Sequence, residues 1–272
     1  MKVNITFASA LVLFAQQVAA NDAIPGIHFA NFLGTLAAQE AAPMWHMPSG
    51  TCMPSAAENN NGQQTNGVVA DNCNIGSLAA GCPPQPPSKG INTFYGGIPG
   101  EPFPIIPTYY RVQKCNGDSS GSNQSWRIVY YVYFKKDTGH MSDWEGIVMR
   151  FTEVGKTDTW VRDSVIMEQD GNHKHMGWGD INDTFDGKDD QFNFRQKNRN
   201  HGKFYFGKFH HSVHHDWYTT AFKNTCPPNS ATDYRNAEYQ WWSVDNLRHT
   251  SFLNSNWNWG AASAPLFDLC AY

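Results

Sequence analysis

The chain has 272 residues and a slightly acidic net charge of -4, with both signs mixed along its length. This balance argues against a nucleic-acid-binding protein, which would show a basic stripe, and against membrane binding through a polybasic patch alone. The length suits a single domain with a sizeable core.

The N-terminal residues have the pattern of an export signal. Lys2 supplies a short positive region, residues 5–15 are apolar, and residues 18–20 are small, as a cleavage position requires. The apolar run is too short to span about 30 Å of hydrocarbon. We therefore expect residues 1–20 to be removed, Asn21 to begin the mature protein, and the protein to be secreted into the extracellular space.

The cysteines agree with export. An even number of cysteines in an exported chain suits disulfide bonds, although spacing alone does not choose among the pairings. The absence of a CxxC pair in the sequence argues against a zinc cluster. The six cysteines are Cys52, Cys73, Cys82, Cys115, Cys226 and Cys270.

The first part of the mature chain, residues 21–103, is expected to be poor in regular structure. An Ala-rich stretch at 31–42 predicts a short helix. Residues 48–103 are dense in Gly, Pro, Ser and Asn and hold three of the cysteines. This composition predicts an irregular, disulfide-held region of the same domain.

The second part, residues 104–272, is expected to be mainly β. Residues 126–134 (WRIVYYVYF) are bulky at every position, as in a central strand that is covered on both faces. Further strands are expected over residues 145–154, 159–167 and 203–213. Ser243 is expected to be the N-cap of a helix that begins at 243–246.

Two carboxylates give the most informative pattern. Asp143 and Glu145 are two apart, so both point to one face of a strand, and that face continues into Ile147, Met149 and Phe151. Two like charges at the margin of an apolar face repel each other, and partial burial adds to the cost. A hard divalent cation such as Ca²⁺ or Mg²⁺ would relieve both terms.

The preceding turn contributes Asp137 and His140, which can close such a cation site. Two other interpretations stay open. Asp137 and His140 can instead cap a hairpin, with Asp143 and Glu145 paired to Arg or Lys. The two acids can also act as general acid and base on a glycosidic bond.

Histidines form the second feature. One run holds His210, His211, His214, His215 and Asp216. Zinc sites use such residues, but there is no HExxH order, so we interpret the run as a partly exposed strand end and turn. His173, His175 and Trp178 stand apart from it and are our candidates for ligand contact.

Residues 131–145 (YVYFKKDTGHMSDWE) resemble the necrosis- and ethylene-inducing Nep1-like proteins, also called NPP1 proteins. That family has an aromatic strand that ends in a Tyr-Phe-x-Lys-Asp pattern, followed by Gly-His-Arg-His-Asp-Trp-Glu. Met141 and Ser142 stand here where the family has Arg and a second His. Cys52 and Cys82 bracket a polar, Gly-rich region like the family's early cysteine pair.

Two later segments extend the resemblance. Residues 241–247 (WWSVDNL) are similar to a Trp-x-x-Leu helix start of the family, and residues 259–266 (WGAASAPL) to its closing Gly-x-Ala-x-Val-Pro-Phe segment. The resemblance implies a single-domain β-sandwich with flanking helices, shaped like actinoporins and some lectins, with residues 104–272 as its core.

The resemblance also implies a function. It implies a divalent cation, Ca²⁺ or Mg²⁺, held by Asp137, His140, Asp143 and Glu145. It implies binding to sugar head groups of plant glycosyl inositol phosphoryl ceramide lipids at the plasma membrane, which many members then disrupt. No enzymatic turnover is implied, and we expect a monomer.

Two alternatives to a cytolytic effector are kept. Ser142 lacks the imidazole of the family's second His, so a divergent, non-toxic sugar-binding member is the first alternative. A secreted carbohydrate hydrolase that uses Asp143 and Glu145 is the second.

Overall fold

A computed structural model describes most of the chain that follows the predicted leader. The described residues are 21–59, 61–86, 90–91, 106–117, 124–169, 171–187, 195–217, 220–221, 232–233 and 238–272. The predicted leader, 1–20, and Cys226 lie outside them.

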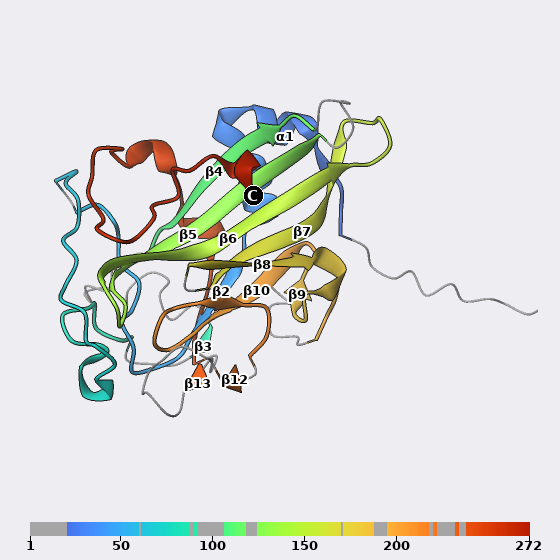
Figure 1. Ribbon diagram of the computed structural model, residues 1–272. Helices are drawn as coiled ribbons and strands as arrows, with labels where there is room; N and C mark the ends of the chain where they lie inside the picture. The colour runs from blue at the N-terminus through green and yellow to red at the C-terminus, as the bar shows by residue number, and fades with distance from the viewer. Residues whose placement is uncertain are drawn as a thin grey trace, which may run out of the picture.

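The larger sheet lies over the smaller one (Figure 1). Within the described residues it has seven strands in the order β1-β7-β6-β5-β4-β15, with β8 paired to β7. Its strands are β1 (Ile24–Pro25), β4 (Thr108–Cys115), β5 (Ser125–Lys136), β6 (Met141–Glu153), β7 (Thr159–Gln169), β8 (Asn172–Gly177) and β15 (Leu247–His249). The predicted central strand 126–134 is confirmed as the middle of β5, and the strands predicted at 145–154 and 159–167 correspond to β6 and β7.

The second sheet has six strands among the described residues, in the order β11-β10-β2-β14-β3, with β9 paired to β10. They are β2 (Met44–Met47), β3 (Gly90–Ile91), β9 (Thr184–Phe185), β10 (His201–Phe206), β11 (Val213–His214) and β14 (Tyr239–Trp242); β12 (Thr220–Ala221) and β13 (Thr232–Asp233) form a separate pair. The single strand predicted at 203–213 is therefore two strands, β10 and β11, joined by residues 207–212.

The main core fills the space between the sheets. Side chains of β5 alternate, so Phe134 and its even-numbered neighbours face the second sheet, where Phe134 meets Phe206 with ring centroids 5.4 Å apart. The odd-numbered face carries Tyr131 and Tyr133 into a second apolar cluster with Trp259. Burying each such large side chain contributes about 2–3 kcal/mol. Both faces of β5 are covered, which explains its uniformly bulky sequence.

Short helices flank the sheets and complete a mainly β, sandwich-type fold. They are α1 (Gly26–Ala30), η1 (Phe32–Gly34), α2 (Thr35–Glu40), η2 (Ile75–Ser77), η3 (Trp178–Asp180), η4 (Ser243–Asn246), η5 (Thr250–Phe252) and η6 (Leu269–Ala271). The helix predicted within 31–42 is confirmed as α2. No helix among the described residues is long and apolar enough to cross a membrane.

The expected N-cap at Ser243 is wrong. Residues 243–246 form one 3-10 turn, and Trp242 occupies the cap position. The Ser243 hydroxyl donates instead to the Pro43 carbonyl oxygen at 2.7 Å, which ties this turn to the segment before β2. A tertiary contact has thus displaced the local cap.

Disulfides hold the irregular segments. Cys52 bonds to Cys82, and Cys115 bonds to Cys270. Cys73 is disulfide-bonded as well. The described part of 48–103 is largely irregular, as predicted, and its first disulfide joins the pair that the family resemblance implies.

Candidate functional site

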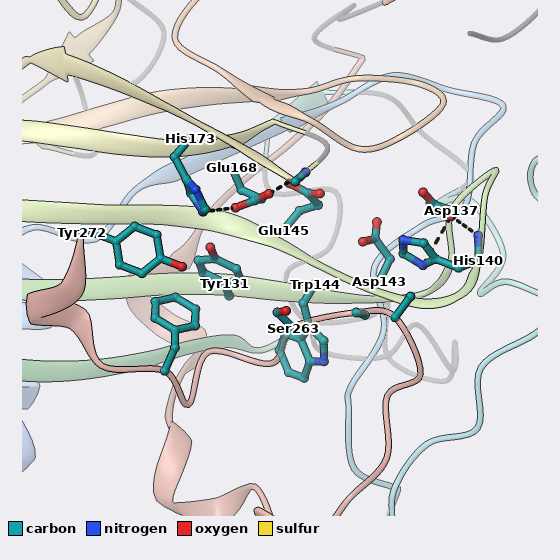
Figure 2. A pocket seen from close by; sticks show the side chains of 14 residues that line it. Tyr131, Asp137, His140, Asp143, Trp144, Glu145, Glu168, His173, Ser263 and Tyr272 are labelled. Atoms are coloured by element: carbon teal, nitrogen blue, oxygen red, sulfur yellow. Dashed lines mark hydrogen bonds and ion pairs between the residues drawn. The ribbon is translucent and has the colours of Figure 1, made fainter. Parts of the chain in front are cut away.

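A cavity of about 310 Å³ opens beside the first half of β6. β6 pairs with β5 from Met141 to Thr152, whereas its pairing with β7 runs from Ile147 to Glu153. The residues that line the cavity are Tyr131, Asp137, His140, Asp143, Trp144, Glu145, Glu168, Gly171, His173, Ala261, Ala262, Ser263, Phe267 and Tyr272. All four residues predicted to hold a cation are among them (Figure 2).

The two strand acids share one face, as the period-two pattern predicts. Asp143 lies opposite Phe134 and Glu145 opposite Val132, both of which belong to the main core. Each carboxylate residue is only 4% exposed. The same face continues into Ile147, which is fully buried. The predicted placement of two acids at the margin of an apolar face is confirmed.

A histidine from the second sheet pairs with Asp143. His211 lies in the β10–β11 connection and places Nδ1 2.8 Å from Asp143 Oδ2. Its ring stacks on Phe134 with centroids 3.9 Å apart and an interplanar angle of 7°. Burial raises the pKa of Asp143 well above its usual value, and the charge of Asp137 adds to this shift.

Asp137 belongs to the turn between β5 and β6. Its Oδ1 accepts from the backbone N–H of Gly139 at 2.7 Å and of His140 at 2.6 Å, so this carboxylate caps the turn while it also lines the cavity. Its Oδ2 lies 3.3 Å from Nδ1 of His210. Burial alone would raise the pKa of Asp137, but the hydrogen bond with His210 and the charge of His140 bring it below the usual value.

His140 folds back over its own turn. Its Nδ1 lies 2.7 Å from the carbonyl oxygen of Ser142 and 3.6 Å from Asp137 Oδ1. The ring is about one-third exposed, at the mouth of the cavity beside Asp137. The His140 imidazole thus contacts its own turn and also lines the cavity.

A fourth carboxylate comes from β7, and sequence reasoning missed it. Glu168 accepts from the backbone N–H of Gly171 at 2.9 Å, and its Oε2 lies 2.6 Å from Nε2 of His173 (Figure 2). Burial raises the pKa of Tyr131, and Glu168 and Glu145 raise it further. Glu168 is the second-last residue of β7, and Asp170 follows it at the same spacing that singled out Asp143 and Glu145, so this pair was a signal that sequence reasoning overlooked.

The three candidate ligand-contact residues separate in the structure. His173 lines the cavity. His175 is exposed on β8 and is not among the lining residues. Trp178 is only 1% exposed within the main core, and its indole N–H donates to the Arg199 carbonyl oxygen at 2.8 Å. The expectation for Trp178 is corrected, because the core covers its ring.

The histidine run also needs a correction. It occupies a connection and a strand end, as expected, and His210, His215 and Asp216 are half-buried, but the other two histidines are more buried than a partly exposed turn implies. His211 is 1% exposed and His214 7% exposed. His210 and His211 contact Asp137 and Asp143, so this run supports the cavity from the opposite sheet.

Ser142 and Met141 take different positions around the hairpin. Ser142 has a φ of 62° and is 4% exposed, and its hydroxyl lies 3.1 Å from the Tyr133 hydroxyl. A Cβ added at Gly67 would overlap both Met141 and Ser142, so the backbone at Gly67 packs directly against the start of β6. Met141 is 51% exposed. Neither side chain lines the cavity.

The donor chemistry of the cavity fits a hard cation. Asp137, Asp143 and Glu145 are buried carboxylates that face one space, and oxygen ligands suit Ca²⁺ and Mg²⁺. As the side chains stand, no three His, Cys, Asp or Glu residues of the described chain converge into a ready-made metal centre. The cation site therefore stays a prediction.

Comparison with known proteins gave matches only among solved structures. No family model matches the sequence, and no curated protein matches it. Solved structures of Nep1-like proteins are similar to this chain. One is the non-toxic HaNLP3 protein, with 16% identity, coverage of 86% of this chain and 85% of that one, and a TM-score of 0.47.

Two further structures are of NLPPya. A triple mutant is 18% identical, covers 90% of both chains and has a TM-score of 0.48. NLPPya in complex with mannosamine is 18% identical, also covers 90% of both chains and has a TM-score of 0.47.

Proposed function

We propose that this protein is a secreted effector of the Nep1-like type. In this proposal it binds the sugar head groups of plant glycosyl inositol phosphoryl ceramide lipids through a divalent cation held in the carboxylate cavity. It acts as a monomer at the plasma-membrane surface, disrupts that membrane after binding, and catalyses no turnover. The resemblance of residues 139–145 (GHMSDWE) to the family heptapeptide supports the assignment.

One observation carries the proposal. Asp137, Asp143 and Glu145 are each 4% exposed and line a single cavity. Burying several carboxylates together is costly unless something neutralises them. Burial raises the pKa of Asp143, as this cost predicts. A divalent ion among the three carboxylates would offset the cost.

The residues have separate parts in this proposal. Asp143 and Glu145 would hold the ion from β6, and Asp137 and His140 would hold it from the turn. A bound Ca²⁺ or Mg²⁺ supplies positive charge and coordination positions that sugar hydroxyls fill in place of water. The second sheet keeps Asp143 oriented through His211.

Vesicle binding tests the proposal. Liposomes that contain plant glycosyl inositol phosphoryl ceramide should pull down the protein in Ca²⁺ or Mg²⁺ but not in EDTA. Glu145→Gln should abolish this binding. Asp163→Asn, which changes an acid with a 40% exposed side chain on β7, should leave it intact. Equal binding to liposomes that lack the glycolipid would contradict the proposal.

Dye leakage from the liposomes distinguishes a membrane-disrupting effector from the first alternative, a non-toxic sugar-binding protein. A cytolysin releases dye from those liposomes, whereas a non-toxic sugar-binding member binds them and releases none. Because Met141 and Ser142 stand where the family has Arg and His, toxicity has to be measured directly, and dye leakage is that measurement.

A hydrolase is the second alternative, and one observation favours it. Asp143 and Glu145, the acid pair of this alternative, are buried carboxylates that line one cavity, and two carboxylates beside a glycosidic bond can serve as acid and base. This reading requires the release of reducing sugar from a glycan by the wild type and its loss in Asp143→Asn. Our proposal expects no release from either protein.

A further inference from the structure

Residues 267–272 form a wall of the cavity that neither the heptapeptide nor the proposed cation site includes. This segment, red in Figure 1, lies over β4 and β5 and contains η6. Phe267 and Tyr272 line the cavity together with Tyr131 of β5. The ring centroids of Tyr131 and Phe267 are 5.9 Å apart, and those of Phe267 and Tyr272 are 5.0 Å apart. The wall is thus a continuous aromatic surface.

The segment is fixed to the sheet rather than resting loosely on it. Cys270 is bonded to Cys115 at the end of β4. The Arg127 guanidinium of β5 donates to the carbonyl oxygens of Leu269 and Tyr272. Such anchors on both neighbouring strands hold the aromatic wall in one position, which lowers the entropic cost of using it for binding.

Gln113 and Arg111 add further anchors from β4. The Gln113 side chain donates to Asp268 Oδ1 at 2.7 Å and accepts from the Leu269 backbone N–H at 3.1 Å. Arg111 donates to the Phe267 carbonyl oxygen. The segment therefore carries its own set of hydrogen bonds in addition to the disulfide.

Polar groups meet this aromatic wall at the cavity. The His173 ring packs edge-on to Tyr272 with centroids 4.6 Å apart, and the same His173 pairs with Glu168 at 2.6 Å (Figure 2). The two oxygens of Glu168 contact His173 and Gly171, so the carboxylate is fixed in orientation beside the rings. Aromatic faces next to an oriented carboxylate suit a sugar ring, which has an apolar C–H face and a rim of hydroxyl donors.

We propose that residues 267–272, with Glu168 and His173, form a second sugar-contact wall of the cavity, which meets the cation-binding acids where Glu168 lies beside Glu145 (Figure 2). Tyr272 takes the apolar face of a pyranose ring, and Glu168 accepts hydrogen bonds from its hydroxyls. The Cys115–Cys270 disulfide and the hydrogen bonds from β4 and β5 hold this wall in place, and the disulfide is the covalent anchor among them. This inference rests on the proposed saccharide function of the same cavity.

Titration with mannosamine, followed by ligand-observed NMR in the presence of Ca²⁺, tests the wall. Tyr272→Ala should weaken binding by about tenfold, since a stacked aromatic contact contributes about 0.5–1.5 kcal/mol. Tyr272→Phe keeps the ring and should stay within about twofold of the wild type. Phe252→Ala removes a 60% exposed aromatic ring that is not among the cavity-lining residues and should have no effect.

The disulfide is tested by a Cys115→Ser, Cys270→Ser double variant. Binding of mannosamine should fall by about tenfold or more. The shift in melting temperature on adding Ca²⁺ should persist, because the cation-binding acids belong to β6 and the β5–β6 turn and not to residues 267–272. The Tyr272 variants retain the disulfide and keep the inference testable if the double variant does not fold.

The outcomes distinguish this inference from the proposed function. If the wild type binds and Asp143→Asn does not, but Tyr272→Ala binds like the wild type, the second wall is overturned and the proposed function stands. If the wild type binds no mannosamine or related hexose, both are overturned.

Discussion

Acidic residues with the same exposure in this protein differ in ionisation because their hydrogen-bond partners and neighbouring charges differ. Asp137 and Asp143 are six positions apart and face one cavity, yet the pKa of the first is lowered and that of the second is raised. His210 lies against Asp137, while Asp143 is fully enclosed beside His211. The same side-chain chemistry therefore has two different ionisation tendencies within one site.

At Ser142 we predict that restoring the family's histidine damages the fold. Ser142→His places a large ring at a buried residue with φ of 62°, and it loses the hydroxyl contact with Tyr133. Overpacking at this buried position and the lost hydroxyl contact should together lower the free energy of unfolding by about 2–4 kcal/mol. Urea denaturation measures this loss.

Ser142→Gly is the matched control for that substitution. Glycine adopts positive φ freely, so this variant should stay within about 1 kcal/mol of the wild type. A Ser142→His variant as stable as the Ser142→Gly variant would contradict the prediction that the imidazole does not fit at this position.

The buried His201 should make the fold acid-sensitive. Burial, with a contribution from Arg162, lowers the pKa of His201 to about 3, from 6.5 in an unfolded chain. The unfolded state then binds a proton that the folded state refuses, so stability is lost as pH falls from about 6.5 toward about 3. The slope from this group is about 1.4 kcal/mol per pH unit.

His201→Gln should flatten this acid slope. The amide N–H can replace the ring Nδ1 that lies 2.9 Å from the Ala42 carbonyl oxygen, and it does not titrate. Free energies of unfolding at pH 7 and pH 4 give the slope for both proteins. The buried His46, whose pKa is also lowered, keeps its own contribution, so the slope should shrink without vanishing. Identical slopes would refute the assignment to His201.

At the scale of elements, the β5–β6 hairpin is the part that sequence reasoning predicts best. Alternation placed Asp143, Glu145 and Ile147 on one face, because side-chain direction in a strand is local. The contribution of His211 was not predictable in this way, because it reaches Asp143 from the second sheet, 68 residues away along the chain. Glu168 is on the strand that follows β6, and only the sheet arrangement places it at the cavity. Trp178 was misassigned because an aromatic residue after a strand looks the same whether the core covers it or not.

The close approach of β5 and β6 explains why the residue after Glu145, Gly146, is a glycine. A Cβ at Gly146 would overlap the Tyr130 carbonyl oxygen and the Tyr131 ring. Gly146→Ala should therefore destabilise the protein by about 2–4 kcal/mol and disturb the acid next to it. Gly179→Ala, where a Cβ meets nothing within 4 Å, is the control and should have little effect on the denaturation midpoint. Equal midpoints for both variants would contradict this packing.

At the scale of the whole molecule, the two disulfides whose partners both lie in the described residues close loops of very different lengths. Cys52 and Cys82 are separated by 30 residues, whereas Cys115 and Cys270 are separated by 155. The mainly β architecture was predictable from strand composition, and an early Cys52–Cys82 pair from the family resemblance. The Cys115–Cys270 bond was not, because spacing carries no information on which distant segments meet.

The longer closed loop should contribute more to stability. Loop-closure entropy gives about 5 kcal/mol for Cys115–Cys270 and about 3.5 kcal/mol for Cys52–Cys82. Replacing the first pair by serine should therefore lower the melting temperature more than replacing the second. Calorimetry on both double variants checks the order, and the reverse order would contradict it.

Cation binding to the purified protein is the most direct test of the carboxylate cavity. Isothermal titration of EDTA-treated wild type with Ca²⁺ and with Mg²⁺ should show one ion bound per chain, with no binding in the Asp143→Asn, Glu145→Gln double variant and full binding in Asp163→Asn. Absence of binding in the wild type, or equal binding in the double variant, would show that these buried acids are not held for a cation.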